Sequence, residues 1–174
     1  MGTRARSGGY TFHDFCRVVG DDRKADLIDG VIRYEGPEDP ETNLLHLWLL
    51  FVLNDFAAAK DLGRVFAFKV AFRLDDWNGP EPDIAFLRKE WAHLVKREYV
   101  DGRPDLALEI VSPETVEQDY RLKREQYQRA SVPEYWLVDD IEQRVVLLRL
   151  AANGKYREVR LRKGGLASQV MPGF

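Results

Sequence analysis

The chain has 174 residues, of which 45% are hydrophobic, and a formal net charge of −3. This length and composition fit one globular domain with a sizeable core. The single cysteine, Cys16, excludes a disulfide framework and a cysteine-based zinc cluster, and it suits a reducing cytoplasm. The negative charge argues against a general nucleic-acid coat protein, which is usually basic, but it is compatible with a local basic patch.

Residues 1–9 contain arginines but no apolar stretch of the kind found in signal peptides. They predict a flexible tail that precedes one domain at 10–174. The longest apolar run, 44–56, is interrupted by polar residues, so no apolar run is expected to cross a membrane. We therefore expect a cytoplasmic protein that makes no membrane contact.

The N-terminal part of the domain predicts a helix and a hairpin. A short helix is expected at 10–19, with Thr11 as the N-cap and Asp14 completing a capping box. Residues 25–34 have the pattern of a β-hairpin, with Asp29-Gly30 as its turn.

The clearest helix is predicted at 41–60, and Gly63 follows its end. Its apolar residues predict one buried face made of Leu44, Leu47, Phe51, Leu53, Phe56 and Ala57.

The rest of the chain predicts mainly strands, with one further helix at 113–130 and polar connections at 75–81 and 89–104. The strands are expected at 65–74, 82–87, 106–111, 135–138, 144–150 and 156–161. This order predicts an α/β or α+β fold with a central sheet.

Two carboxylates occur in apolar, strand-like runs. Side chains alternate along a strand, so Glu109 shares its face with Ala107 and Val111. Taken alone, Glu109 also fits a solvated edge strand or a salt bridge, and Asp83 also fits an ordinary strand-start position. Together, two carboxylates on neighbouring strands can converge on Mg²⁺, which takes one or two carboxylates plus waters, and the Ile110 carbonyl can add a third oxygen.

The helix after Ser112-Pro113 carries a lysine in the middle of an apolar stripe. A lysine in this position either extends to the rim of the core or directs its ammonium at Asp83, Glu109 and a bound phosphate. The stripe follows steps of four, three, four and three residues and consists of Val116, Tyr120, Lys123, Tyr127 and Ala130.

These segments, taken in order, resemble the Uma-two family of restriction-endonuclease-like proteins, within the PD-(D/E)XK nuclease superfamily. The resemblance covers nearly the whole chain. It rests on residues 26–30, on His46 in the first long helix, and on residues 82–84, 104–113, 119–127, 132–139 and 171–174.

The resemblance implies a central mixed β-sheet flanked by helices and a catalytic set of Asp83, Glu109 and Lys123. Asp83 and Glu109, with the Ile110 carbonyl, would bind Mg²⁺ or Mn²⁺. In the wider superfamily the lysine follows the acid by two residues, a position that Val111 holds here, so Lys123 on the next helix would replace it. The family also leads us to expect a glutamate at the position of Asp26.

The remaining site predictions concern neighbours and nucleic-acid contacts. Asp26, His46, Asp119 and Tyr127 are candidate neighbours of the site, although a lone helix histidine is more often structural. Lys69, Arg121 and Arg124 are the candidate nucleic-acid contacts, although most such charges only solvate a surface.

The predicted function is therefore metal-dependent hydrolysis of phosphodiester bonds in DNA, with no organic cofactor. A homodimer is expected because cutting both strands of a duplex needs two active sites. Three alternatives stay open at this stage. They are an inactive nuclease fold that binds nucleic acid or protein, a nuclease or phosphodiesterase that acts on RNA or single strands, and a structural protein with a buried ion cluster.

Overall fold

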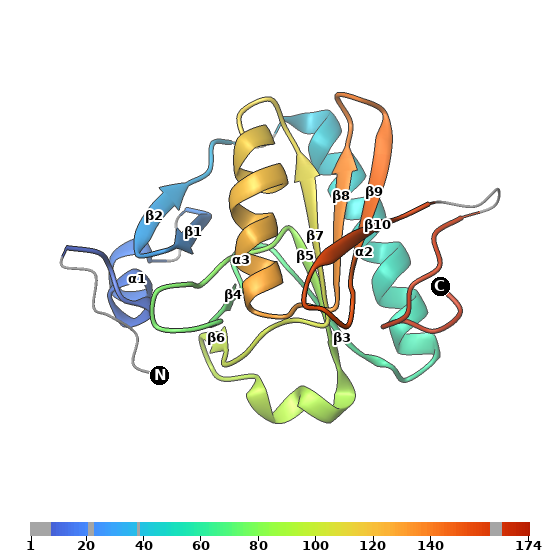
Figure 1. The fold of residues 1–174 in the computed structure, drawn as a ribbon, viewed down its shortest axis with the longest axis horizontal. Helices are drawn as coiled ribbons and strands as arrows, with labels where there is room; N and C mark the ends of the chain where they lie inside the picture. Colours follow the sequence, from blue (N-terminus) through green and yellow to red (C-terminus); the bar gives the residue numbers. More distant parts are fainter. Residues whose placement is uncertain (1–7, 21–22, 38, 161–164) are drawn as a thin grey trace.

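The computed structural model describes residues 8–20, 23–37, 39–160 and 165–174 (Figure 1). A six-stranded sheet with the order β10-β9-β8-β7-β5-β3 forms its centre. In this sheet β7 and β8 are parallel, and every other neighbouring pair is antiparallel. A mixed central sheet flanked by helices was the predicted fold class, and it is confirmed. The predicted tail at 1–9 lies mostly outside the described residues.

The elements have the following bounds: α1 Phe12–Val19, β1 Ala25–Ile28, β2 Val31–Tyr34, α2 Pro40–Ala59, β3 Gly63–Ala67, β4 Ala71–Phe72, β5 Ile84–Arg88, a 3₁₀ helix Lys89–Leu94, β6 Tyr99–Val100, β7 Leu106–Val111, a π-helical segment Gln118–Lys123, α3 Arg124–Arg129, β8 Glu134–Asp139, β9 Arg144–Leu150 and β10 Tyr156–Val159.

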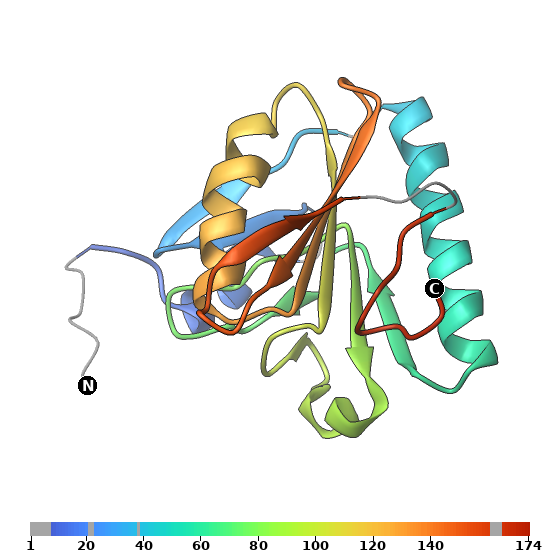
Figure 2. The same ribbon diagram turned by 45° about the vertical axis from the view of Figure 1, so that its right-hand side comes forward.

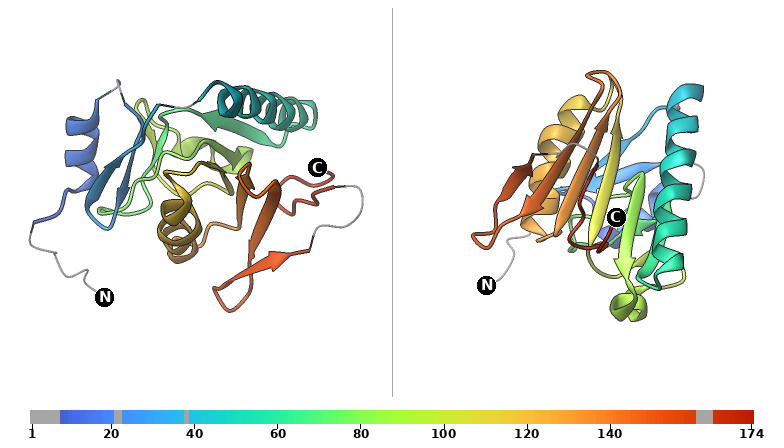
Figure 3. Two further views of the ribbon diagram at one scale, coloured as in Figure 1. Left: turned by 90° about the horizontal axis from the view of Figure 1, so that it is seen from above. Right: turned by 90° about the vertical axis from the view of Figure 1, so that its right-hand side faces the viewer.

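Helices cover both faces of the large sheet (Figure 3). On one face, Leu53 and Ala57 of α2 pack in the cluster that contains Trp136 of β8. On the other face, Tyr127 of α3 packs in the cluster that contains Ala107 of β7. Alternate side chains of β7 and β8 therefore pack in two separate hydrophobic cores, one on each face of the sheet.

The C-terminal segment closes the α2 side of the sheet (Figure 2). Val170 and Met171 are buried in the same cluster as α2. The Phe174 ring centroid lies 5.1 Å from that of Phe56 and 5.8 Å from that of Trp136.

The local signals at the N-terminal end correctly predicted α1 and the β1–β2 hairpin. The Asp14 N–H donates to Thr11 Oγ1 at 3.2 Å, and the Thr11 N–H donates to Asp14 Oδ2 at 3.1 Å, which completes the capping box. In the hairpin turn Asp29 has φ 51° and Gly30 has φ 80°. Tight hairpins need positive φ at these two positions, and the Asp-Gly pair supplies it.

The long strand predicted at 65–74 is wrong, because the chain forms β3 and then β4 in different sheets. The break falls at Phe68 and Lys69, whose φ angles are 56° and 20°. This turn sends β4 away to pair with β6, which lies inside the predicted polar connection at 89–104.

The helix predicted at 113–130 is interrupted by the π-helical segment Gln118–Lys123. A π turn holds more residues than an α turn, so the predicted stripe does not stay on one face. Lys123 and Tyr127 are buried, but Val116 is 41% exposed.

Helix α2 also departs from the prediction. Leu53 and Ala57 are buried as expected, whereas Leu44, Trp48 and Phe51 are each about 60% exposed. The helix is apolar around its circumference, so it has two apolar faces and the sheet covers only one.

Within the described part of the chain, α2 is also the helix that is long and apolar enough to cross a membrane, contrary to the prediction for this run. Length and composition alone do not separate such a helix from one packed on a sheet.

Candidate active site

The two predicted carboxylates lie side by side where β5 begins and β7 ends. Asp83 directly precedes β5, and Glu109 belongs to β7, which pairs with β5. The Asp83 N–H donates to Glu109 Oε2 at 3.3 Å, and the Ile110 N–H donates to Asp83 Oδ2 at 2.7 Å. Because the N–H and C=O of one strand residue point to the same side, the Ile110 carbonyl also faces Asp83.

Lys123 extends from the π-helical segment toward these carboxylates. Its Nζ lies 3.0 Å from Glu109 Oε2, 2.9 Å from Asp26 Oδ2 and 3.2 Å from Glu35 Oε1. An ammonium has three N–H donors, so these three carboxylates can engage all of them.

A second lysine, which the sequence did not single out, completes the arrangement. Lys24 contacts Asp83 Oδ1 directly, and its Nζ lies 2.8 Å from Glu35 Oε2. The contacts form a closed loop that runs from Asp83 through Lys24, Glu35, Lys123 and Glu109 back to Asp83. We call these five residues the charge ring.

The charge ring has an inner and an outer side. The side chains of Lys123 and Glu109 are each 1% exposed, whereas those of Lys24, Glu35 and Asp83 are 18%, 15% and 14% exposed. Solvent therefore reaches the ring at Lys24, Glu35 and Asp83.

Neutral side chains and backbone groups hold the inner acids in place. The Tyr127 hydroxyl donates to Glu109 Oε1 at 2.8 Å. Gln118 Nε2 and the Glu81 N–H donate to the two carboxylate oxygens of Asp26 at 2.9 Å and 2.8 Å. Each of these bonds satisfies an acceptor that burial would otherwise leave unpaired.

Burial and charge act in opposite directions on the inner groups. Burial lowers the pKa of the Lys123 ammonium, but the carboxylates of Asp26 and Glu109 outweigh it and raise this pKa well above its usual range. Burial also raises the pKa of Glu109 well above its ordinary value, against the opposing effect of Lys123. Lys123 is therefore a fixed cation, and Glu109 binds a proton more readily than a free glutamate does.

Three further acids show the same competition. Burial raises the pKa of Glu81 to about 7 and that of Asp119 to about 6. Burial also works on Glu35, but Lys123 and Lys24 outweigh it and lower the Glu35 pKa to about 2. Asp119 Oδ1 is buried without a hydrogen-bond partner and lies 3.7 Å from Lys123 Nζ.

His46 contacts the backbone of the site. It is buried in α2, and its Nε2 donates to the Asp83 carbonyl oxygen at 2.9 Å. Its ring also lies 4.7 Å, between centroids, from that of Phe68. These contacts place His46 beside the charge ring but outside it.

The three candidate nucleic-acid contacts lie on the surface. Lys69 follows Phe68 in the turn between β3 and β4, and Arg121 and Arg124 are exposed on the helical segment that carries Lys123. Arg121 Nη2 lies 2.5 Å from Glu117 Oε1.

Lys24 and Glu35 were missed, although the sequence contains a signal for them. They flank the β1–β2 hairpin, and the Glu35 N–H donates to the Lys24 carbonyl at 3.0 Å. Because Ala25 pairs with Tyr34, Lys24 and Glu35 lie opposite each other, and Lys24 shares a face with Asp26. The hairpin register predicts this pairing once the strands are extended by one residue.

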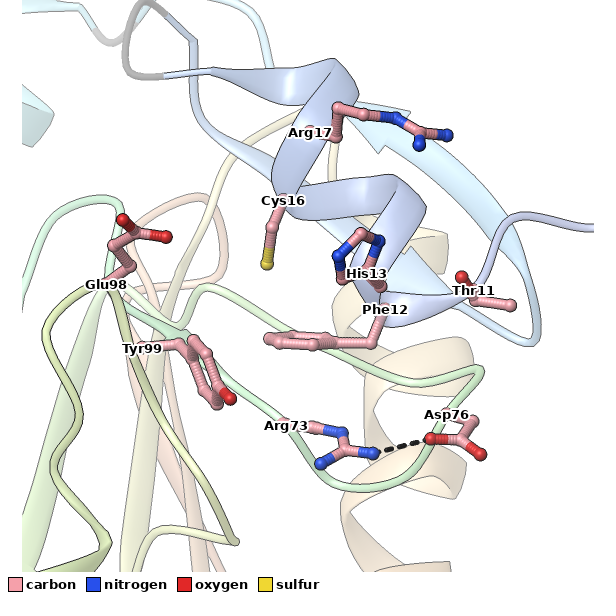
Figure 4. Close-up of a pocket in the computed structure, with 9 residues that line it drawn as sticks. All are labelled: Thr11, Phe12, His13, Cys16, Arg17, Arg73, Asp76, Glu98 and Tyr99. Atoms are coloured by element: carbon pink, nitrogen blue, oxygen red, sulfur yellow. Dashed lines mark hydrogen bonds and ion pairs between the residues drawn. The ribbon is translucent and has the colours of Figure 1, made fainter.

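A separate cavity of about 640 Å³ lies between α1 and the loops that carry Arg73 and Glu98 (Figure 4). The Phe12 ring, the Cys16 thiol and the Tyr99 ring point into it. The cavity shares no lining residue with the charge ring. The Cys16 thiol belongs to an exposed residue, and partial burial raises its pKa, which disfavours the thiolate form.

The chain is similar to known proteins in both sequence and fold. The sequence profile of the Uma2 family, described as "Putative restriction endonuclease", matches residues 10–174. The chain belongs to the Uma2 family. This membership confirms the resemblance found from the sequence and supports nuclease function in general terms.

A solved structure also resembles this Uma2 chain. It is described as a "putative nuclease belonging to DUF820 from Anabaena variabilis ATCC 29413". The match has a TM-score of 0.67 at 18% identity and covers 80% of this chain and 79% of that one, which shows a shared fold. No curated protein matches the chain.

Proposed function

We propose that this Uma2 chain is a metal-dependent endonuclease that hydrolyses phosphodiester bonds of DNA. The observation that carries the proposal is the position of the Asp83 and Glu109 carboxylates, which lie side by side with the Lys123 ammonium 3.0 Å from Glu109. Two acids and an ammonium at one point suit phosphoryl transfer, because negative charge develops there in the transition state.

The residues present fit a hard divalent cation. The carboxylates in and beside the charge ring include those of Asp26, Glu35, Asp83, Glu109 and Asp119, whereas its ammonium groups are those of Lys24 and Lys123. A divalent cation would offset this excess of negative charge. Among the described residues there is no ready-made group of three or more His, Cys, Asp or Glu ligands. Mg²⁺ and Mn²⁺ need only one or two carboxylates, because waters complete their coordination shell.

Asp83, Glu109 and the Ile110 carbonyl would hold this cation. When bound, Mg²⁺ or Mn²⁺ would act as a Lewis acid that polarises the scissile phosphate, and it would lower the pKa of a bound water. Tyr127 keeps Glu109 oriented by donating to its second oxygen.

Lys123 is the residue we assign to the charge that develops on the phosphoryl oxygens. All three of its N–H donors are engaged by Asp26, Glu35 and Glu109. Glu35 is the partner that it can release at the lowest cost, because Lys24 still neutralises Glu35. The expected products carry 5′-phosphate and 3′-hydroxyl ends.

Lys69, Arg121 and Arg124 are the proposed contacts to the DNA backbone. All three are exposed, and basic side chains at the surface neutralise phosphates irrespective of base sequence. Replacing one of them is expected to weaken DNA binding uniformly and to reduce its dependence on salt concentration.

A homodimer in the cytoplasm is part of the same proposal. Leu44, Trp48 and Phe51 follow each other at steps of four and three residues, so they form one exposed stripe on α2. Exposed apolar patches of this kind commonly mark protein contacts. A second copy would supply the second active site that duplex cleavage needs.

The proposal is tested by plasmid nicking in Mg²⁺ or Mn²⁺, with wild type beside Asp83→Asn and Glu109→Gln. Each variant keeps the shape of the side chain and removes its charge. We expect cleavage to fall by at least about a hundredfold in both, because each acid is assigned to the cation. Asp61→Asn is the matched control, since it removes the same charge from an exposed acid that pairs with Lys89. Undiminished cutting by Asp83→Asn would rule out the assignment.

One observation favours a second function, an inactive nuclease fold that binds nucleic acid or protein. Both oxygens of Asp83 and both oxygens of Glu109 already have partners within the chain. Wild type that retards DNA in a gel but never cuts it, with either metal, would establish this second function.

A further inference from the structure

We propose that Lys24 competes with the divalent cation for Asp83 and that Glu35 receives the displaced Lys24 ammonium, so that this pair sets the metal affinity of the site. This inference rests on the proposed function, because it takes Asp83 to be a metal ligand.

Lys24 occupies the oxygen of Asp83 that a metal cation would need. Lys24 Nζ bonds Asp83 Oδ1, while Asp83 Oδ2 accepts from the Ile110 N–H. A metal cation that binds Asp83 through Oδ1 must therefore displace the Lys24 ammonium from that oxygen. Two cations on one carboxylate oxygen repel each other, so the ammonium has to leave.

The contact between Lys24 and Asp83 lies on the solvent side of the charge ring. Lys24, Glu35 and Asp83 are the members of the charge ring that solvent reaches, whereas Glu109 and Lys123 are closed in. An incoming cation therefore meets the Lys24–Asp83 contact before it reaches Glu109.

Glu35 is positioned to hold the Lys24 ammonium after it is displaced. Glu35 Oε2 already lies 2.8 Å from Lys24 Nζ, and the Glu35 N–H bonds the Lys24 carbonyl at 3.0 Å. Lys24 can give up Asp83 and keep an anionic partner without any change in the hairpin backbone. Without Glu35, a displaced Lys24 would be left partly buried and unpaired, which is unfavourable.

These contacts predict opposite effects for two substitutions. In Lys24→Met the competitor is absent, so Mn²⁺ should bind about tenfold more tightly or better. In Glu35→Gln the competitor loses its second partner and holds Asp83 more firmly, so Mn²⁺ should bind about tenfold more weakly.

The experiment is titration calorimetry of Mn²⁺ into the full chain, for wild type, Lys24→Met, Glu35→Gln and the double variant. If Glu35 acts through Lys24, Glu35→Gln should change the affinity little in the Lys24→Met background. If the two effects add, Glu35 acts only as a nearby negative charge, and the proposed handover is wrong. Lys89→Met controls for the loss of a lysine elsewhere.

The outcomes separate this inference from the proposed function. Wild type that binds Mn²⁺ with an affinity that Lys24→Met leaves unchanged overturns the inference and keeps the metal site. If neither wild type nor Lys24→Met binds Mn²⁺ at millimolar concentration, the metal site itself is wrong. Thermal melts check that each variant is folded. If Lys24→Met fails to fold, Glu35→Gln still decides, because affinity equal to wild type contradicts the role of Glu35.

Discussion

Among the described residues of the candidate site, Lys123 contacts the largest number of carboxylates. It is fully buried and bonds carboxylates from the hairpin and from β7. A buried ion network of this kind costs free energy to assemble, and removing one partner leaves the others without compensation. Its presence in the core is better explained by function than by stability.

Lys123→Met therefore tests how tightly the buried acids depend on this ammonium. We expect the free energy of unfolding to fall by about 3–5 kcal/mol, because Asp26 and Glu109 stay buried without their cation. Urea denaturation at pH 7 measures the change. The exposed Lys89–Asp61 pair is the contrast, and Lys89→Met should cost at most about 1 kcal/mol. Equal, small losses in the two variants would contradict the buried network.

Glu81 gives the site a pH dependence of known sign. Its pKa rises from 4.5 to about 7 through burial, with Asp26, Lys24 and Glu35 as the charged groups around it. The folded state thus binds this proton more strongly than the unfolded state. The resulting stabilisation is complete below pH 4.5 and is lost as the pH rises through 7.

Glu81→Gln should remove this component of the pH dependence. Between pH 5 and pH 8 the unfolding free energy of wild type is expected to fall more steeply than that of the variant, by on the order of 2 kcal/mol. Denaturant melts in chelator at intervals of half a pH unit measure the slope. Parallel curves for the two proteins would show that Glu81 keeps an ordinary pKa.

Among single residues, the sequence indicated Asp83, Glu109 and Lys123 but not Lys24 and Glu35. Strand alternation and helix spacing indicated Glu109 and Lys123, because both are local patterns. Lys24 and Glu35 lie just beyond the strand ends of a hairpin, where charged residues are normally solvated. Only the pairing across the hairpin and the approach of Asp83 distinguish them, and that approach is a tertiary contact.

Among the elements, the contact between β3 and β5 depends on a residue without a side chain. A Cβ added at Gly63 would lie 2.1 Å from the Leu87 carbonyl oxygen, which is part of the backbone and cannot rotate away. Gly63 pairs with Arg88 of β5, so a backbone shift at Gly63 would also displace β5. This strand begins directly after Asp83.

Gly63→Ala should therefore destabilise the protein by about 2 kcal/mol or more. Gly36→Ala is the matched control, since a Cβ there would meet nothing within 4 Å. Thermal unfolding followed by circular dichroism compares the two. A Gly63→Ala protein as stable as the control would mean that β3 separates from β5 at little cost.

The elements that the sequence predicted well are those with a local cause. The capping box at Thr11 and the Asp29-Gly30 turn are examples. The strand prediction failed at Phe68 and Lys69, where the chain leaves one sheet and joins another. The alternation of apolar and polar residues continues through this turn, so it does not reveal the break. The π-helical segment was missed because the sequence spacing fits an α-helix equally well.

For the whole molecule, α2 leaves an apolar stripe facing outward, and the proposed dimer gives it a partner. Trp48→Glu places a charge in the centre of this stripe and should convert a dimer into a monomer, as measured by light scattering on a sizing column. Ile141→Glu is the control, because Ile141 is 49% exposed in the turn after β8 and does not belong to α2. Wild type that stays monomeric at high concentration would refute the dimer.

The charge ring joins parts of the chain that are far apart in sequence. Glu35 and Lys123 are separated by 88 positions, and Lys24 and Asp83 by 59. On the ribosome, a nascent chain that has released the hairpin and both acids still lacks the ammonium. The cleavage that we propose therefore begins only after most of the domain has been synthesised, and an interrupted translation product that ends before Lys123 would be harmless to the cell's own DNA.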